Sequence, residues 1–463
     1  MATGVTSNNW KEDAHIITDE VFIGDYKYEL KYVGKSDEKE ILELKPKNKY
    51  DLIIGGKKDN HLYFGDNLDV MSFLIHQKKL KGKVKLVYID PPYGTNSIFQ
   101  SRHQKDSYKD DLVGSHFIEF IRRRLILIRE LLTEDGSIYL HLDGNMTFQI
   151  KVIMDEIFGA NNFRGFITRK KCSNKNSTRK TYGNISDYII FYSKSENYIW
   201  HRATDAWTDE KILKEYPCID EKSGRRFKKV PIHAPGIRNG ETGKEWRGML
   251  PPHGKHWQYT PEKLDEFDAK GEIYWSSTGN PRRKVFLDKD KGIPVQDIWL
   301  DVQDSLNQSI KITGYPTEKN PYLLERIIKA SSNEGDIVLD CFAGSGTTLD
   351  LAEQFRRKWI GIDNSSEAIQ NIFKRFYAGL EEMGDYVNKN NVHSSLIYNQ
   401  STLFEPQTKY NSNLKERKNF NFYADRRFKD IILEIIDDHL DKESNCAGRL
   451  ITSDDIESKI SHT

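Results

Sequence analysis

Asp90, Pro91, Pro92 and Tyr93 form the segment of the sequence best suited to chemistry. They directly follow the apolar run 84–89, which predicts a strand, so they stand at a strand's carboxyl end, where open α/β sheets bind ligands. The two prolines fix the chain and remove backbone donors. A carboxylate, a free carbonyl oxygen and an aromatic ring held together could grip the exocyclic amine of a planar base that stacks on the ring.

A second segment, 340–348, reads Asp-Cys-Phe-Ala-Gly-Ser-Gly-Thr-Thr and lies between a predicted strand at 336–339 and a predicted helix at 347–355. Such a glycine-rich turn allows close backbone approach and presents free helix amides, which suits a nucleotide-like ligand. The next predicted strand ends in Asp363, 17 positions after Gly346, near the ~20 at which an acidic residue takes ribose hydroxyls. The third glycine of the dinucleotide fingerprint and the GxxxxGK[ST] motif are both absent, which disfavours NAD, FAD and ATP hydrolysis.

Alternating apolar segments predict the scaffold around these motifs. Short runs bounded by Gly, Asp or Pro predict buried parallel strands at 51–54, 61–64 and 84–89, and further strands at 137–142, 187–194 and 358–362. Apolar residues at three- and four-residue steps predict helices at 66–81, 116–132 and 145–158. This alternation predicts a doubly wound α/β sheet.

The alternation stops after about residue 194, in a stretch where Pro, Gly and basic residues interrupt short aromatic pieces. It returns at about residue 316. We therefore expect five parts: an N-terminal extension (1–50), a first α/β part (51–194), an inserted domain of mixed β and loop structure (195–304), a second α/β part (305–400) and a C-terminal tail (401–463) with a helix at 426–440.

A basic segment at 163–186 holds seven Arg and Lys residues and no acidic residue. Its Ser and Asn content predicts a loop, and we expect this loop to contact phosphates, with a merely solvated loop as the alternative. Together with two arginines of the inserted domain, the candidate phosphate contacts are Arg169, Lys170, Lys171, Lys175, Arg179, Lys180, Arg282 and Arg283.

Composition narrows the class of protein. Among 463 residues, 70 Lys and Arg oppose 69 Asp and Glu, so nucleic-acid contact must come from local patches. No apolar run approaches the ~18 residues of a membrane helix, and the N-terminus lacks the pattern of a signal peptide. The four cysteines form no CxxC pair. We expect a cytosolic protein with reduced thiols, no membrane association and no metal.

The two motifs together resemble those of the amino-DNA methyltransferases, which use S-adenosylmethionine (AdoMet). Asp90 to Tyr93 is similar to their catalytic motif, and Phe342 to Gly346 is similar to their cofactor loop. The catalytic motif comes first and the insertion separates the two, which is similar to the β group that includes type III modification subunits and related solitary enzymes. The resemblance covers about 63–367 and implies a circularly permuted, Rossmann-like AdoMet-dependent methyltransferase sheet, with 195–304 as target recognition domain.

The resemblance also implies roles for individual residues. Asp90 and the Pro91 carbonyl would hold the two protons of the target amine, and Tyr93 would stack on a base flipped out of the duplex. Asp66 would contact the adenine of the cofactor, Asp363 its ribose, and Thr317 and Lys319 its methionine end. The full cofactor set comprises Asp66, Thr317, Lys319, Asp340, Phe342, Gly344, Gly346, Thr347 and Asp363.

We therefore predict methylation of adenine N6 in double-stranded DNA, because Asp rather than Ser precedes Pro-Pro-Tyr. Methylation of cytosine N4 uses the same pocket logic and is the first alternative. An RNA or protein amine methyltransferase, and a DNA recognition subunit that keeps AdoMet only as a ligand, are the others. Cytosine C5 chemistry through Cys218 and a zinc site of His233, His253 and His256 are disfavoured. A cognate restriction subunit and a homodimer are left open as partners.

Overall fold

The computed structural model describes residues 28–55, 59–92, 114–172, 180–304, 318–378 and 420–428, and the backbone of short strands at 98–100, 106–109, 311–312 and 381–382. Within these residues the chain forms two compact units. Unit 2 comprises residues 202–296, and unit 1 comprises the rest. Unit 2 lies inside the expected insertion at 195–304, whose flanks at 195–201 and 297–304 belong to unit 1.

A ten-stranded sheet forms the centre of unit 1. Its strands from one edge to the other are β1 (Tyr50–Ile54), β22 (Asn421–Asp425), β2 (His61–Phe64), β20 (Lys358–Asp363), β19 (Ile337–Asp340), β3 (Val84–Ile89), β6 (Leu132–Leu142), β8 (Ser186–Ser193), β7 (Phe163–Lys170) and β17 (Ile298–Trp299). The strands from β22 to β6 are mutually parallel, whereas β8 is antiparallel to both of its neighbours.

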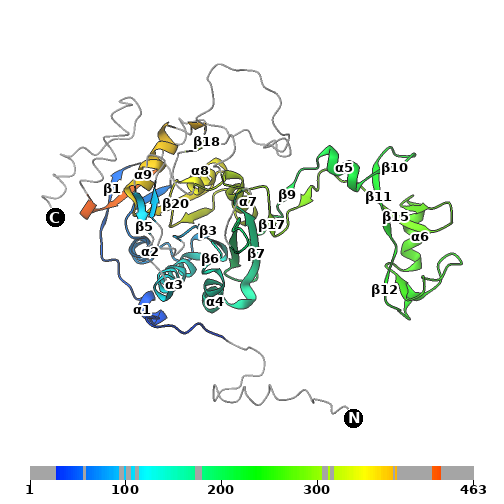
Figure 1. Ribbon diagram of the computed structural model, residues 1–463, viewed down its shortest axis with the longest axis horizontal. Helices are drawn as coiled ribbons and strands as arrows, with labels where there is room; N and C mark the ends of the chain where they lie inside the picture. Colours follow the sequence, from blue (N-terminus) through cyan, green and yellow to red (C-terminus); the bar gives the residue numbers. More distant parts are fainter. Residues whose placement is uncertain are drawn as a thin grey trace, which may run out of the picture. The chain divides into compact units, whose positions relative to one another are not determined.

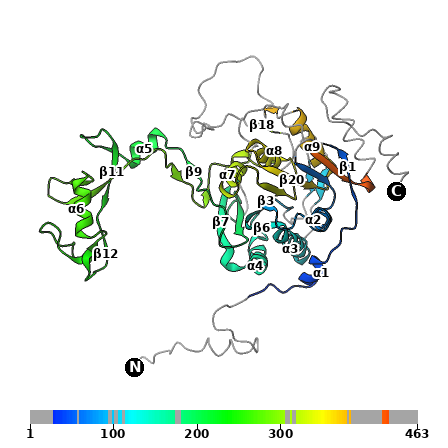
Figure 2. The ribbon, with the colours of Figure 1, turned by 180° about the vertical axis from the view of Figure 1, so that it is seen from behind.

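Helices cover both faces of this sheet (Figure 1, Figure 2). One layer consists of α1 (Glu38–Leu42), α2 (Asn67–His76), α3 (Gly114–Leu131) and α4 (Thr147–Phe158). The other consists of α7 (Pro321–Ser331), α8 (Thr347–Gln354) and α9 (Ser366–Phe373). Because both faces are covered, the central strands are apolar throughout, and β3 is buried at every position except the half-buried Lys85. The predicted doubly wound α/β sheet is confirmed.

Local signals fix the helix ends that border the site. The Asp66 side chain accepts the backbone N–H of Asp69 and so caps α2. Asn320 caps α7 by accepting the N–H of Tyr322 at 3.0 Å, and Pro321 occupies the first turn, where a missing donor costs nothing. These caps set where each helix begins relative to the sheet edge.

Two expectations about unit 1 are wrong. Strand 51–54 is not parallel: β1 lies at the sheet edge and pairs antiparallel with β22, with Tyr50 opposite Asp425. The sequence could not show this, because β22 comes from a distant part of the chain that local patterning cannot reveal. The segment 163–170 is a strand, β7, rather than part of a loop, because its alternating side chains pack against β8. Of the helix expected at 426–440, only 426–428 are described, as a 3-10 turn.

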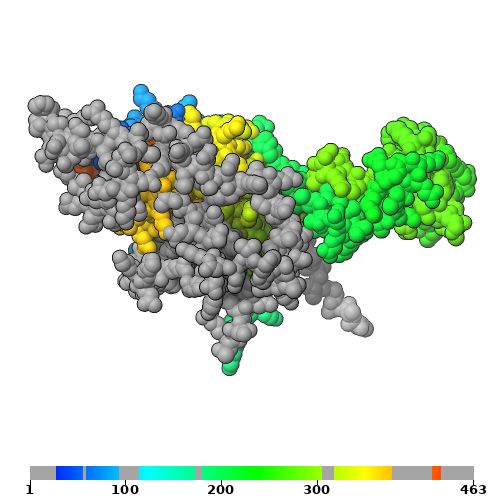
Figure 3. Space-filling model, turned by 90° about the horizontal axis from the view of Figure 1, so that it is seen from above, coloured from blue at the N-terminus to red at the C-terminus, as the bar shows by residue number. Residues whose placement is uncertain are grey.

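Unit 2 has its own sheet and core. The strands β10 (Cys218–Ile219), β11 (Arg226–Pro231), β15 (Pro281–Phe286) and β14 (Ile273–Trp275) form an antiparallel sheet beside α6 (Pro261–Ala269). Trp246, Trp257, Leu264 and Phe267 pack into a separate hydrophobic cluster. The surface of this unit is green in Figure 3.

The chain enters and leaves unit 2 side by side. β9 (Thr204–Asp205) pairs antiparallel with β16 (Ile293–Pro294), and the N–H of Val295 donates to the carbonyl of Ala203 at 3.0 Å. The remaining short elements are β12 (His233–Pro235) with β13 (Lys255–Trp257), α5 (Asp209–Glu215), β4 (Ile98–Gln100) with β5 (Asp106–Lys109), and β18 (Lys311–Ile312) with β21 (Glu381–Glu382). Among the described residues, no helix is long and apolar enough to cross a membrane.

Candidate active site

The two motifs meet at the carboxyl ends of two neighbouring strands. β3 and β19 are parallel and adjacent, with Val338 opposite Leu86 and Leu339 opposite Val87. From this pair the chain continues outward in opposite directions, from β3 through α3 to β6 and from β19 through α8 to β20. The pair therefore forms the topological switch point of the sheet, where doubly wound folds bind ligands. Asp90 follows β3, and Asp340 ends β19.

A cavity of about 330 Å³ opens at this switch point. Residues of both motifs and of the segments before α2 and α7 line it. The predicted residues among them are Asp66, Asp90, Pro92, Lys319, Asp340, Phe342, Gly344, Thr347 and Asp363. Gly346 belongs to the glycine-rich turn but does not line the cavity. Pro91, which follows Asp90 in the sequence, is buried. Tyr93 and Thr317 lie outside the described residues.

The glycine-rich turn is held by backbone geometry that only glycine adopts easily. Gly344 has φ 49° and Gly346 has φ 74°, both in the left-handed region. A Cβ atom on Gly346 would also lie 2.8 Å from Cγ1 of Ile372 on α9. The Asp363 carboxylate accepts the N–H of Gly344 at 2.8 Å and that of Ser365 at 2.9 Å, so it fastens the turn to the end of β20.

Two carboxyl groups of the cavity are removed from solvent, Asp340 almost fully and Asp363 in part. Burial raises the pKa of Asp340 to about 7, although the Phe342 N–H donates to its carboxylate at 3.0 Å. Burial also raises the pKa of Asp363, against the opposing effect of the backbone N–H groups that it accepts. The cavity floor therefore carries a carboxyl group that changes its charge near neutral pH.

Asp66 also lines the cavity, beside an arginine that the sequence prediction missed. The Arg124 guanidinium donates to Asn67 Oδ1 at 2.5 Å and to Asp66 Oδ2 at 3.2 Å. It also covers the Phe120 ring, whose centroid is 3.4 Å from Cζ. The signal was present, because Arg124 occupies the apolar face of a predicted helix, where an unpaired arginine would be costly.

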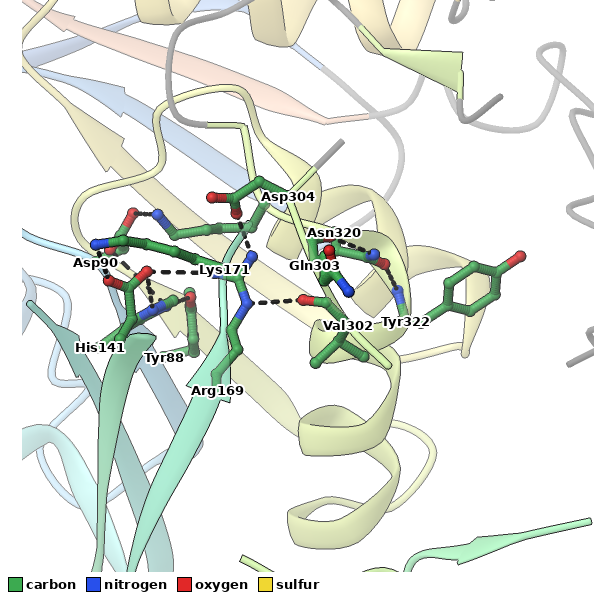
Figure 4. Close-up of polar contacts among 12 residues, drawn as sticks. Tyr88, Asp90, His141, Arg169, Lys171, Val302, Gln303, Asp304, Asn320 and Tyr322 are labelled. Carbon is green, nitrogen blue, oxygen red and sulfur yellow. Dashed lines mark hydrogen bonds and ion pairs between the residues drawn. The ribbon is translucent and has the colours of Figure 1, made fainter. Parts of the chain in front are cut away.

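Asp90 stands between a lysine and a histidine. Nζ of Lys319 lies 2.6 Å from one Asp90 oxygen, and Nδ1 of His141 lies 3.9 Å from the other. Lys319 was expected near the methionine end of the cofactor, and it lines the same cavity while pairing with Asp90. Tyr88, Asp90 and His141 lie together near the ends of their strands in Figure 4.

His141 was not a predicted site residue. It lies on β6, is fully buried, and shares a hydrogen bond of 2.8 Å with the Tyr88 hydroxyl through Nδ1. Its Nε2 lies 3.4 Å from Oδ2 of Asp187, at the start of β8. Burial lowers the pKa of the imidazole. The available signal was a histidine among apolar residues at the carboxyl end of a predicted core strand.

Arg169 is a corrected prediction, because it cannot serve as a phosphate contact. Its side chain is fully buried, its Nε donates to the Val302 carbonyl at 2.7 Å, and it is ion-paired with Asp304 (Figure 4). Because burying an unpaired guanidinium is costly, these partners fix it inside unit 1. The sequence could not show this, since its partners come from beyond unit 2 in the chain.

The other predicted phosphate contacts are distributed over both units. Lys170 and Lys171 are half-buried in unit 1, where Lys171 pairs with Asp187 at 2.9 Å, and Lys180 is exposed. Arg282 is exposed on β15 of unit 2, where neighbouring Arg283 donates to the Tyr259 hydroxyl at 2.8 Å. Lys175 and Arg179 lie outside the described residues.

Comparison with known families gives one extended match. The model of the N6/N4 methyltransferase family, described as DNA methylase, matches residues 84–375. A type II methyltransferase of Enterobacter cloacae, M.EcaI, is 50% identical over 78% of this chain and 80% of its own length. The Mod subunit of the type III restriction-modification enzyme StyLTI of Salmonella typhimurium is 27% identical, and the match spans 69% of this chain and 55% of that subunit.

Solved structures give weaker matches. M1.HpyAVI in complex with SAM is 18% identical, with a TM-score of 0.35 over 68% of this chain and 98% of that one. The cytosine-N4-specific PvuII DNA methyltransferase is 15% identical, with a TM-score of 0.38 over 74% of this chain and 93% of that one.

Proposed function

Since this chain belongs to the DNA methylase family of N6/N4 methyltransferases, we propose that it transfers a methyl group from AdoMet to N6 of an adenine flipped out of duplex DNA. The observation that carries the proposal is the cavity at the switch point of the sheet, because it holds the Asp90 motif and the glycine-rich turn together. One site thus contains the groups that would hold an amine and those that would hold a nucleoside cofactor.

The residues of the cavity fit AdoMet by their chemistry. The Phe120 and Phe342 rings, with centroids 6.1 Å apart, offer apolar faces for a purine, and the Asp66 carboxylate is an acceptor for its amine. The Asp363 oxygens each retain a second lone pair for ribose hydroxyls. Lys319 and Asp340, in its ionised form, would provide opposite charges for the amino-acid end and the sulfonium of AdoMet.

The protein's own task in the reaction is positioning. AdoMet, when bound, supplies an electrophilic methyl group on a cationic sulfur. Asp90 and the Pro91 carbonyl accept the two N–H groups of the target amine, which localises its lone pair and aims it for in-line displacement. Tyr93 stacks on the flipped base, and no covalent enzyme intermediate is needed.

We assign DNA recognition to unit 2 and to the exposed cations of unit 1. Arg282 on β15 and Lys180 are exposed, and Lys170, Lys171 and Arg283 are partly so, which supports contacts to backbone phosphates. Such contacts offset the few kcal/mol that base flipping costs. Lys175 and Arg179 belong to the same proposed set.

We assign the enzyme to a restriction-modification system, because its relatives are named type II methyltransferases and Mod subunits of type III restriction-modification enzymes. Cytosine N4 is the second candidate target, since it presents the same kind of exocyclic amine. Asp90 ahead of Pro-Pro-Tyr supports adenine.

The test is to incubate the purified protein with unmethylated duplex DNA and methyl-labelled AdoMet, digest the DNA to nucleosides and identify the labelled base by mass spectrometry. Labelled N6-methyladenine is expected. Labelled N4-methylcytosine would keep the mechanism and overturn the base assignment. AdoMet binding without label in DNA, but with label in RNA or protein, would overturn the substrate class.

A further inference from the structure

His141 is a buried titratable group that the proposed methyl transfer leaves without a task. It comes from β6, next to β3, and is fully buried at the rear of Asp90. Its two ring nitrogens face different acidic groups, because Nδ1 lies 3.9 Å from Asp90 and Nε2 lies 3.4 Å from Asp187. Nε2 has no hydrogen bond of good geometry among the described residues, so a small rotation of the ring would complete its contact with Asp187.

The charges around His141 define its resting state. Burial and the cations Lys319 and Arg169 lower the pKa of the ring, whereas Asp187 and Asp90 raise it. Burial is the largest of these effects, so the ring is neutral at neutral pH. The Asp187 carboxylate, whose pKa is low because of His141, Lys319 and Lys171, favours the tautomer with the proton on Nε2. Nδ1 is then the acceptor, and it takes the hydrogen bond of the Tyr88 hydroxyl.

The proposed chemistry requires a proton acceptor. An exocyclic amine that gains a methyl group becomes a cation and must release one N–H proton. Asp90 is the first acceptor in reach: one of its oxygens lies 2.6 Å from Nζ of Lys319, and the other faces Nδ1 of His141 at 3.9 Å. His141, on the opposite side of Asp90 from Lys319, is a neutral base oriented by a carboxylate, which is the arrangement of a general base and its orienting group.

On the basis of the proposed function, we propose that His141 acts through Asp90 as the final proton acceptor of the methyl transfer. Asp187 orients the imidazole and stabilises its cationic form. The N–C bond forms as the carbon–sulfur bond breaks, and the N–H electron pair returns to nitrogen as the proton leaves. The proton passes to Asp90 and then to Nδ1 of His141 once the carboxylate turns to close the 3.9 Å gap. The Tyr88 hydroxyl rotates from donor to acceptor, and the imidazolium loses its proton to water before the next cycle.

One test needs no activity. Protein labelled with ¹⁵N in its histidines, loaded with AdoMet, should show at pH 7.5 a neutral His141 ring with Nε2 protonated and Nδ1 bare. The signal is assigned by its loss in His141→Asn. An imidazolium, or the opposite tautomer, at that pH would overturn the proposal because Nδ1 would already carry a proton.

The second test is the pH dependence of single-turnover methyl transfer to DNA. The wild-type rate should fall on the acidic side with a midpoint below 6.5, the ordinary value for histidine, because a protonated ring cannot accept. His141→Asn should lose this acidic limb and be at least tenfold slower on the plateau. Asp187→Asn, the second variant, should move the limb to lower pH, since the imidazolium loses its anion.

His61→Asn is the matched control. His61 lies on β2 of the same sheet, has a buried Nδ1 without a hydrogen-bond partner among the described residues, and also has a pKa lowered by burial. The charged groups that act on it are Asp59, Lys78 and Lys358 rather than Asp90. It should keep the acidic limb. If the wild type is active but His141→Asn and His141→Gln both keep the acidic limb, the proton route is contradicted and the proposed function stands. A wild type that binds AdoMet and leaves DNA unlabelled contradicts both this route and the proposed function.

Discussion

At the scale of single residues, the site is governed by how burial changes the charge of a few side chains. Asp340, Asp363 and His141 are all drawn towards their neutral forms by burial, whereas Asp90 has a lysine at 2.6 Å. The cavity thus contains one firmly paired carboxylate beside others whose charge a bound cation would change. A cationic cofactor is well matched to such a site.

Asp340 should therefore link AdoMet binding to pH. Its pKa of about 7 means that the group is largely protonated at pH 6, and a cationic ligand must then displace that proton to bind. We expect AdoMet affinity, measured by isothermal titration calorimetry, to rise towards tenfold between pH 6 and 8, with proton release near pH 6.5. S-adenosylhomocysteine, which lacks the sulfonium charge, should show a weaker dependence, and Asp340→Asn should abolish it. An AdoMet affinity independent of pH in the wild type would contradict this view of Asp340.

The same pKa affects stability in a defined direction. A carboxyl group with a folded-state pKa of about 7 and an ordinary value of 3.8 binds more protons in the folded than in the unfolded state between these values. Its contribution to the free energy of unfolding therefore falls as pH rises from about 4 to 7. Thermal unfolding of Asp340→Asn without ligand should consequently show a smaller loss of Tm over this range than the wild type.

At the scale of elements, the turn between β19 and α8 determines whether the two motifs face one cavity. Gly346 begins α8 in the left-handed region and packs against Ile372 of α9, so this glycine fixes both the helix start and its neighbour. Asp363 also fastens this turn to the end of β20. Most of the cofactor side of the site thus depends on one backbone conformation.

Gly346→Ala should weaken AdoMet binding and stability together. The positive φ costs about 1–2 kcal/mol, and the contact with Ile372 adds about 1–3 kcal/mol of overpacking. Gly335→Ala is the matched control, because Gly335 has φ 83° but nothing within 4 Å of its added Cβ. Chemical denaturation should show a larger loss for Gly346→Ala, and only that variant should lose AdoMet affinity. Equal losses in both variants would mean that the strained backbone, not the packing of the turn on α9, decides the effect.

The sequence allowed the central elements to be predicted but not their long-range partners. β3 at Val84–Ile89 has the predicted bounds, because its apolar run is a local signal. β1 and β7 were misjudged because pairing direction and strand packing depend on residues distant in the chain. For the same reason His141 was missed and Arg169 was misread, since their partners lie in other strands or beyond unit 2 in the chain.

At the scale of the whole molecule, the cavity belongs to one compact unit and residues 202–296 form another. Every residue lining the cavity belongs to unit 1, and unit 2 has a hydrophobic cluster of its own. The two crossing points of the chain are neighbours, since β9 pairs with β16. Under the proposed function, DNA recognition could therefore vary in unit 2 without disturbing the reaction site in unit 1.

Replacing residues 203–295 by a short Gly/Ser linker should therefore separate the two functions. We expect AdoMet affinity within about threefold of the wild type and at least a tenfold loss of duplex DNA binding in fluorescence anisotropy. Arg282→Ala in the full chain is the milder probe, and its effect should grow weaker at high salt, as expected for a phosphate contact. Unchanged DNA affinity in the linker variant would contradict the assignment of recognition to unit 2.

We propose that Asp90 positions the target amine in a cavity that binds the cofactor independently of this carboxylate. The most direct test of this proposal compares single-turnover methyl transfer and AdoMet affinity in the wild type and Asp90→Asn. This change preserves the shape of the side chain but replaces one acceptor oxygen by an amide donor. We expect Asp90→Asn to transfer methyl groups to DNA at least 100-fold more slowly, with AdoMet affinity within about fivefold of the wild type. Transfer at the wild-type rate by Asp90→Asn, or loss of AdoMet binding alone, would contradict it.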